Sequence, residues 1–216
     1  MESELLKIFD EHRNPVGVAT REEVHKLGHW HETFHCWFIS RENGIDYIHF
    51  QIRSKTKKDY PNLLDITAAG HILAHETVYD GIREVKEEVG IDVSFDELVS
   101  LGIIDYCVTM EDFIDKELAH VFLYENKKTM DEYKLQIEEV SGIVKAEFNS
   151  FSELWLGEMD EITVEGFEMN EAGEKISIHK AVDKSNFVSH EHSYYESIIR
   201  LMRENMKSLG STKADI

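Results

Sequence analysis

The chain has 216 residues, which is enough for one sizeable hydrophobic core or for one core with an appended segment. Its 43 acidic and 23 basic side chains give a formal net charge of -20 at neutral pH, which disfavours binding to a nucleic-acid backbone or to an anionic membrane surface. Cys36 and Cys107 are the two cysteines, and the sequence has neither a leader pattern nor a long apolar run, so we expect a cytoplasmic protein without disulfides or membrane spans.

The N-terminal part of the chain is predicted to be mainly β-strand, with a concentration of histidines. Asn14-Pro15 followed by Gly17 is a turn signal that joins two short strands. Residues 34–39 are aromatic and strand-forming. Four of the twelve histidines lie just before or within this stretch, namely His25, His29, His31 and His35.

His31-Glu32-Thr33-Phe34-His35 has the H-E-x-x-H spacing of zinc proteases, in which a helix brings two histidines onto one metal ion. The strand formers that follow favour a strand instead, on which His31 and His35 share one face in a different geometry. We expect these histidines to line a pocket wall near a substrate or to take ordinary core and surface positions. A zinc protease remains an alternative function that a strand at 31–35 would eliminate.

Residues 46–53 alternate apolar and polar side chains, as a half-buried strand does. The next segment, SKTKKDYPN, is basic in an otherwise acidic chain. Together with the end of the strand it supplies Arg53, Lys55, Lys57 and Lys58. Such cations suit the phosphate groups of a substrate, and the alternative is a solvated loop.

Residues 77–90 are predicted to form an amphipathic helix with one acidic face. Its apolar stripe consists of Val78, Ile82, Val85 and Val89, while Thr77 with Asp80 resembles a capping box and Gly90 is a C-terminal stop. Glu84, Glu87 and Glu88 lie at relative positions 0, +3 and +4, so their like charges share one face and repel. A divalent cation bound to this face would offset the repulsion between the carboxylates, and hard oxygen ligands of this kind suit Mg²⁺ or Mn²⁺.

Residues 70–91, GHILAHETVYDGIREVKEEVGI, resemble the Nudix box, whose pattern is G-x5-E-x7-R-E-U-x-E-E-x-G-U with U a bulky aliphatic residue. The nine positions from Arg83 to Ile91 all match, as do Gly70 and Glu76, but six residues rather than seven separate Glu76 from Arg83. The role of Glu76 therefore stays open.

This resemblance implies an α/β fold, namely the Nudix α/β/α sandwich with a mixed β-sheet. We expect the Nudix domain to span residues 1–158 and a C-terminal helical extension to span residues 159–216, either packed on the same domain or used in a homodimer. The resemblance also implies a metal-dependent hydrolase that acts on a small-molecule diphosphate, such as a nucleoside diphosphate derivative or another organic diphosphate.

The resemblance further implies roles for individual residues. Glu84, Glu87 and Glu88 bind Mg²⁺ or Mn²⁺, and the backbone carbonyl of Ala69 completes the coordination. The general base is Glu87 or a glutamate on a distant loop, for which Glu139 is preferred over Glu138; a solvated acidic loop is the alternative there. Arg83 lies four residues before Glu87 and orients its carboxylate.

The arrangement Gln51-x-Arg53-Ser54-x-x-Lys57 resembles a stretch of type I isopentenyl-diphosphate isomerase, which shares the Nudix fold. Such residues hold a diphosphate there, so the likeness gives that role to Arg53 and Lys57. The isomerase carries its catalytic cysteine in Thr-Cys-Cys-Ser-His, where this chain reads TAAGH at 67–71. Because the thiol is absent, we expect a hydrolase and not an isomerase, with a Nudix-fold binding or regulatory protein as a second alternative.

The remaining elements follow from periodicity. We predict strands at 101–109 and 118–124, a further strand before residue 148, the start of a helix at 149–158, a small hairpin within 159–185 and an amphipathic helix over 186–208. His190 and His192 can reach a site from this extension or take surface positions.

Overall fold

The computed structural model describes residues 4–110 and 113–211 of the chain. In this part of the chain the strands are β1 (Leu5–Phe9), β2 (Pro15–Thr20), β3 (Trp30–Glu42), β4 (Ile45–Arg53), β5 (Leu64–Ile66), β6 (Ala68–His71), β7 (Leu98–Met110), β8 (Phe113–Glu125), β9 (Val140–Glu147), β10 (Ile162–Met169) and β11 (Lys175–Val182). The α-helices are α1 (Arg21–Leu27), α2 (Arg83–Val89), α3 (Phe148–Leu156) and α4 (His192–Ser211).

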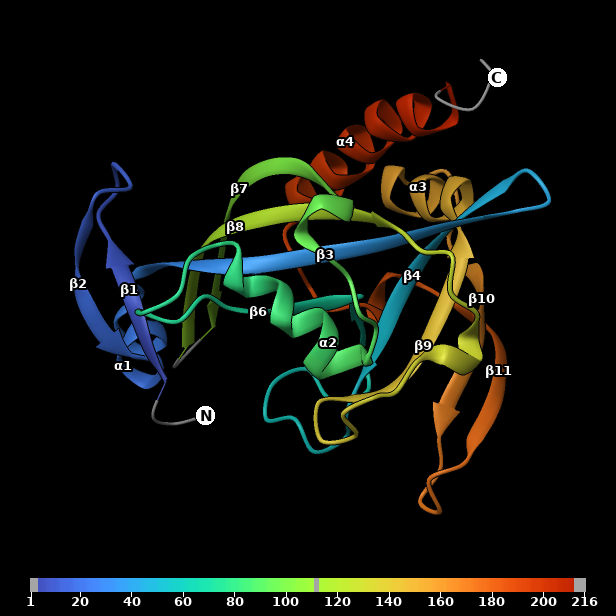
Figure 1. The fold of residues 1–216 in the computed structure, drawn as a ribbon, viewed down its shortest axis with the longest axis horizontal. Helices are drawn as coiled ribbons and strands as arrows, with labels where there is room; N and C mark the ends of the chain where they lie inside the picture. The colour runs from blue at the N-terminus through green and yellow to red at the C-terminus, as the bar shows by residue number, and fades with distance from the viewer. Residues whose placement is uncertain (1–3, 111–112, 212–216) are drawn as a thin grey trace.

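The described strands form one connected sheet between helical layers (Figure 1). Its longest path runs β11-β10-β9-β4-β3-β1-β2, and β5, β6, β7 and β8 pair off this path. Helix α2 packs on one face, where Val85 and Val89 are fully buried, and helices α3 and α4 pack on the other. The sheet is mixed, because β3 and β8 run parallel whereas β3 and β4 run antiparallel.

Strand β3 is the central element, since it pairs with β1, β4, β6 and β8. Its side chains alternate between the two cores: Phe34, Cys36 and Phe38 lie on the α2 side, and Trp37 and Ile39 lie on the side of α3 and α4. The H-E-x-x-H sequence lies on this strand. A metal-binding helix at 31–35 is therefore absent, and the zinc-protease alternative is eliminated.

Two predicted details of the local structure are wrong. Strand β4 is not half-buried: His49 and Gln51 are as inaccessible as the apolar positions, because β4 lies between β3 and β9 with helices on both faces. Helix α2 begins at Arg83 and not near Thr77, whose backbone amide and hydroxyl both donate to the Asp80 carboxylate in a preceding turn.

The other end of α2 agrees with the sequence pattern. Gly90 caps the helix in the left-handed conformation with a φ of 71°, and its amide donates to the carbonyl of Lys86. The apolar stripe of α2 faces the sheet, so its acidic side chains lie along the β6 edge and the cleft beside it.

The C-terminal segment continues the same layers. Strands β10 and β11 form the predicted hairpin and extend the sheet beyond β9. Helix α4 starts at His192 and not at the predicted residue 186, because a 3₁₀ turn at 184–186 and an extended segment precede it. Tyr194 and Ile198 of α4 are buried in the core that contains Trp37 of β3. The division of the chain at residue 158 stays a prediction.

No helix among the described residues is long and apolar enough to cross a lipid bilayer.

Candidate active site

A cleft of about 320 Å³ lies beside α2 and β6 and contains the residues predicted for the site. Its walls include the acidic residues Glu84, Glu87, Glu88 and Glu139, the basic residues Arg53, Lys57 and Arg83, and Ala69. The structure thus brings together residues from α2, from the loop after β4 and from the loop before β9. These loops are joined directly, since the amide of Ser54 donates to the carbonyl of Glu139 over 2.9 Å.

Two carboxylates of α2 lie against the sheet: Glu88 is buried, and Glu84 is largely buried with 12% of its side chain exposed. Burial raises the pKa of Glu84 to about 7, and burial together with the charge of Glu84 raises the pKa of Glu88 to about 8. The Oε2 atom of Glu88 accepts hydrogen bonds from the Ala69 amide over 3.0 Å and from Gln51 Nε2 over 3.3 Å. Glu87 is the exposed member of the set, with 54% of its side chain accessible. A cation at this position would relieve the repulsion between the buried carboxylates.

Gly70 provides the space that the acidic cluster occupies. A Cβ atom at this position would overlap the carboxylate of Glu84, so this carboxylate can keep its place against the β6 backbone only with glycine at residue 70. Glycine therefore fixes the position of this carboxylate and not the spacing of the two elements. The crowded carboxylate set and its close contact with the β6 backbone fit a divalent cation bound by oxygen ligands.

Arg83 is bonded to three carboxylates at once. Its Nη1 atom donates to Glu84 over 2.5 Å and to Glu87 over 3.1 Å. Its Nε atom donates to Glu76 over 2.6 Å, and Nη2 donates to Glu76 and to the carbonyl of His71, each over 3.1 Å. The hydrogen bond with Glu76 is the main cause of a raised Arg83 pKa. Glu76 is thus the fixed partner of Arg83, and it also accepts from the Leu73 amide, which ties down the shortened loop.

The two predicted phosphate contacts already have acidic partners. Arg53 Nη1 donates to Asp65 Oδ2 over 2.8 Å, and its Nε and Nη2 atoms donate to the carbonyl of Asp59. Lys57 forms an ion pair with Glu139, the predicted alternative base. Sequence reasoning placed these residues at one site but did not identify the carboxylates that hold them.

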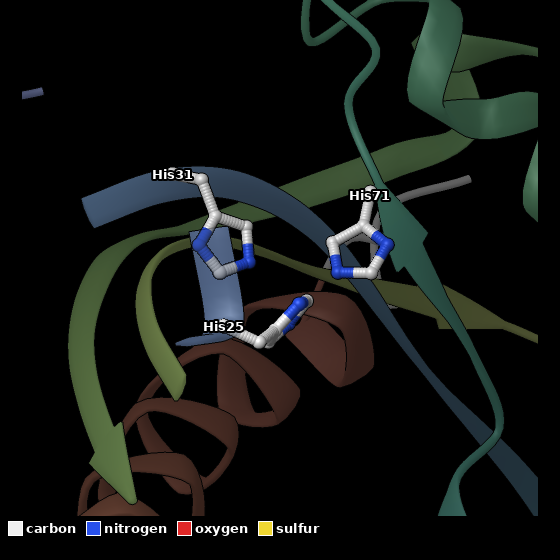
Figure 2. Close-up of side chains that lie close together, drawn as sticks. All are labelled: His25, His31 and His71. Atoms are coloured by element: carbon white, nitrogen blue, oxygen red, sulfur yellow. The ribbon is translucent and has the colours of Figure 1, made fainter. Parts of the chain in front are cut away.

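Three histidines lie close together, as Figure 2 shows, and two of them, His25 and His71, line the cleft. His25 comes from α1, His31 from β3 and His71 from β6, and the ring centroids are 5.1 to 5.3 Å apart. The Nδ1 atoms of His25 and His31 lie 2.8 and 3.2 Å from the carbonyls of Arg21 and His29. These contacts leave the Nε2 atoms of both rings directed at Asp115, at 3.5 and 3.6 Å from Oδ1.

This histidine cluster has the donor set of a transition-metal site. The ligand atoms of His25, His31 and His71 lie within 4.8 Å of one another, and so do those of His31, Asp115 and Glu117. His31 Nε2 and Asp115 Oδ1 are buried and have no hydrogen-bond partner among the described residues. Burial lowers the pKa of His31 to about 4, which leaves its imidazole neutral and able to bind metal.

The two histidines of the H-E-x-x-H sequence have different partners. His31 belongs to the histidine cluster, whereas His35 Nε2 lies 3.1 Å from Glu117 Oε2 and His35 Nδ1 lies 2.8 Å from the Tyr194 hydroxyl. Both expected kinds of position occur, since His25 and His35 line the cleft whereas His31 is fully buried, and a substrate beside this wall stays a prediction. Sequence reasoning missed His71, Asp115 and Glu117, which come from β6 and β8 and have no local spacing signal.

Comparison with known proteins gives relatives over nearly the whole chain, although no protein-family model matches. An uncharacterized Nudix hydrolase of Clostridium acetobutylicum is 39% identical over 205 residues, which cover 95% of this chain and 100% of that protein. An isopentenyl-diphosphate Delta-isomerase of Corynebacterium diphtheriae is 30% identical over 151 residues, which cover 67% of this chain and 79% of that protein.

Two solved structures share the fold. A Deinococcus radiodurans protein superposes with a TM-score of 0.51 at 19% identity, covering 71% of this chain and 90% of that one. A MutT/nudix family protein of Enterococcus faecalis gives a TM-score of 0.51 at 12% identity, covering 82% of this chain and 62% of that one.

Proposed function

The chain belongs to the Nudix hydrolase superfamily and is a Nudix pyrophosphohydrolase, and we propose that it uses Mg²⁺ or Mn²⁺ to hydrolyse a nucleoside diphosphate derivative or another small organic diphosphate. The observation that carries this proposal is the pair of carboxylates Glu84 and Glu88, because Glu84 lies against Gly70, Glu88 accepts from the Ala69 amide and the pKa values of both are raised. In a protein that binds no cation, the desolvation and mutual repulsion of such a pair lower the free energy of unfolding.

Glu84, Glu87, Glu88 and the carbonyl of Ala69 are the ligands we propose for the metal. Bound divalent ions neutralise phosphate oxygens and lower the pKa of a water molecule. Glu87 is the most exposed of the three carboxylates, and we assign it the proton of the attacking water. Arg83 holds Glu87 through Nη1 and is itself fixed by Glu76, so the carboxylate is oriented before substrate binds.

Arg53 and Lys57 are the proposed phosphate contacts. Both line the cleft, and both are held by carboxylates, Arg53 by Asp65 and Lys57 by Glu139. Substrate phosphate would compete with Glu139 for Lys57, which would free Glu139 to accept a proton. Glu139 is therefore the second candidate for the general base.

Isomerisation of isopentenyl diphosphate is not proposed, despite the likeness to the Corynebacterium isomerase. The cleft presents Ala69 where the isomerase pattern has its cysteine. Cys36 is fully buried in the core beneath α2, and burial raises the pKa of its thiol, so it does not replace that nucleophile.

The test is a Mg²⁺-supplemented screen of nucleotide sugars, dinucleoside polyphosphates, coenzyme A and isoprenoid diphosphates. We expect the wild-type protein to release phosphate or a monophosphate, and we expect Glu87→Gln and Glu88→Gln each to lower the rate by at least about a hundredfold while the fold is kept. Lys86→Gln, on the exposed face of the same helix, is the matched control. Full activity in both glutamine variants would remove the assignment, and metal and substrate binding without turnover by the wild type would favour the regulatory alternative.

A further inference from the structure

Asp65 and His190 bring the C-terminal segment into the wall of the cleft. Asp65 lies in β5, His190 lies just before α4, and both line the cleft. His190 Nε2 is 2.9 Å from Asp65 Oδ1, and the side chains are 8% and 7% exposed. Neither residue belongs to the metal-binding, catalytic or phosphate-binding set proposed above.

The main chain holds this segment beside β5. The Val188 amide donates to the Leu64 carbonyl over 2.9 Å, and the Val188 carbonyl accepts from the Tyr195 hydroxyl over 2.8 Å. Leu64 is the residue before Asp65, so these bonds bring the segment up to the carboxylate. The ring of His190 is packed among three tyrosine rings, whose centroids lie 5.1 to 5.5 Å from its own. The position of His190 is therefore fixed by both its backbone and its side chain.

The two carboxylate oxygens of Asp65 have different partners. Oδ1 accepts from His190 Nε2 and from the Ile66 amide, each over 2.9 Å, whereas Oδ2 accepts from Arg53 Nη1 over 2.8 Å. Burial disfavours the charged carboxylate, but the hydrogen bond from His190 and the charge of Arg53 keep the pKa of Asp65 below its ordinary value. An ionised carboxylate only accepts, so His190 Nε2 carries a proton and donates whether the ring is neutral or charged.

Asp65 in turn limits where the guanidinium of Arg53 can lie. Nη1 is held by Asp65, and Nε and Nη2 donate to the Asp59 carbonyl over 3.3 and 2.9 Å. These bonds use three of the five guanidinium N–H groups. One N–H on Nη1 and one on Nη2 have no acceptor among the described residues and remain for a phosphate.

Without this support the guanidinium would not keep its place. The wall of the cleft also carries the carboxylates of Glu87, Glu88 and Glu139, each of which attracts a cation. Because Asp65 is itself fixed through Oδ1, it holds Arg53 at one side of the cleft and away from these other acids.

We propose that Asp65 and His190 are positioning residues of the phosphate site, through which the C-terminal segment holds the guanidinium of Arg53 for the diphosphate of the substrate. The proposal rests on the function proposed above, because Arg53 is a phosphate contact there. His190 acts through Asp65 and Asp65 acts through Arg53. Replacing Arg53 should therefore remove the effect of His190 on diphosphate binding, whereas a direct contact between His190 and the substrate would not depend on Arg53.

Two substitutions of His190 differ in whether they keep the donor for Asp65. His190→Gln places an amide nitrogen near the Nε2 position and keeps this donor, whereas His190→Asn is one methylene shorter and loses it. Tyr195→Phe is the matched control, because it removes the hydroxyl group that holds the Val188 carbonyl and loosens the same segment without touching Asp65. Arg53→Met removes the phosphate contact itself.

The probe is methylenebisphosphonate, a diphosphate analogue that cannot be hydrolysed, and its dissociation constant is measured by calorimetry with Mg²⁺ present. We expect His190→Asn to weaken binding at least about fivefold, and His190→Gln and Tyr195→Phe to change it less than about twofold. Arg53→Met should itself weaken binding about tenfold, and in that background His190→Asn should have an effect of less than about twofold. Urea denaturation of each variant separates loss of folding from loss of binding.

Unchanged binding in His190→Asn would overturn the proposal. Equal losses in His190→Asn and Tyr195→Phe would overturn it as well, because they would show that loosening the segment is sufficient. The same loss from His190→Asn in the wild-type and Arg53→Met backgrounds would show that His190 does not act through Arg53. If His190→Asn does not fold, Asp65→Asn takes its place, and unchanged or tighter binding in that variant contradicts the positioning role.

The proposed function fails in a different way. Unchanged binding in Arg53→Met would remove the phosphate contact assigned above, and the positioning role would fall with it. The expected pattern of binding without turnover of any substrate in the screen would overturn the proposed hydrolysis and leave the roles of Asp65 and His190 standing.

Discussion

Lys57 and Glu139 form an ion pair between the loop after β4 and the loop before β9, with 22% and 15% of their side chains exposed. The proposed phosphate contact and the proposed alternative base thus hold one another in the free protein. Because each side chain loses its partner when the other is replaced, the effects of the two substitutions on the free energy of unfolding are expected to be coupled, and this coupling can be measured.

Lys57→Met is expected to raise KM for the diphosphate substrate about tenfold, because a charge-assisted phosphate contact is lost. It should also lower the free energy of unfolding by about 1 kcal/mol, since Glu139 is left unpaired. Lys57→Met with Glu139→Gln should regain most of that stability but not the KM. Urea denaturation of the two single variants and the double variant measures the coupling, and strictly additive effects would show that the pair is not coupled.

Gly70→Ala is expected to impair the metal site, because the new Cβ overlaps the carboxylate of Glu84. Metal-dependent turnover should fall at least about tenfold, because the displaced carboxylate no longer holds the cation in its place. Gly17→Ala in β2 is the control, since its Cβ would meet Ile8 only at an ordinary distance of 3.8 Å. Wild-type metal affinity in Gly70→Ala, measured by calorimetry, would contradict the proposed position of the cation.

The raised pKa values of Glu84 and Glu88 predict opposite effects of pH on the metal-free and metal-loaded protein. In the metal-free protein both carboxyls keep their protons in the folded state at pH values where the unfolded chain has lost them. Their contribution to the free energy of unfolding is therefore complete below their ordinary pKa, and it is lost as the pH rises through about 7 for Glu84 and about 8 for Glu88. A cation displaces these protons and therefore binds more tightly at higher pH.

The measurement is the melting temperature with Mg²⁺ and with a chelator between about pH 6 and about pH 9. We expect the difference in melting temperature between the protein with Mg²⁺ and the protein with a chelator to widen as the pH rises. Glu88→Gln should reduce this widening, because one of the two titrating carboxyls is gone. A difference that stays constant with pH in the wild type would show that these carboxyls do not exchange protons for metal.

The histidine cluster is expected to bind a transition metal separately from the acidic face of α2. Imidazole ligands suit Zn²⁺ and similar transition-metal ions such as Co²⁺ better than Mg²⁺, so a chelated protein titrated with Co²⁺ should show the visible absorption of the bound ion. His25→Gln with His71→Gln should weaken that binding at least about tenfold, whereas His12→Gln on the surface should not. Unchanged Co²⁺ absorption in the double variant would show that the ion is bound elsewhere.

Several features that local patterns encode were predicted correctly from the sequence, although the start of α2 and the exposure of β4 were not. The Nudix fold with its mixed sheet is confirmed, and so are the apolar stripe of α2, its stop at Gly90 and the β10–β11 hairpin. The fold was expected from the resemblance of residues 70–91 to the Nudix box. The other three features depend on residues that are close in the chain, where periodicity and glycine placement carry the information.

The features that depend on distant residues were not predictable in this way. Asp65 was missed as the partner of both Arg53 and His190, because β5 and the segment before α4 meet only in the folded chain. Glu76 has its role through Arg83, yet the short spacing in the loop left that role open. His71 and Asp115 join His31 only through the pairing of β6 and β8 with β3.

Strand β3 also constrains the order in which the chain can fold. It pairs in parallel with β8, so that Trp30 lies opposite Lys116. Forming this contact closes a very long loop, and the chain entropy is lost before the strand pairing can offset it. During synthesis β3 leaves the ribosome well before β8 exists. Until Glu125 has emerged, the edge of β3 that receives β8 stays unpaired, so chains truncated before that point are expected to aggregate instead of folding.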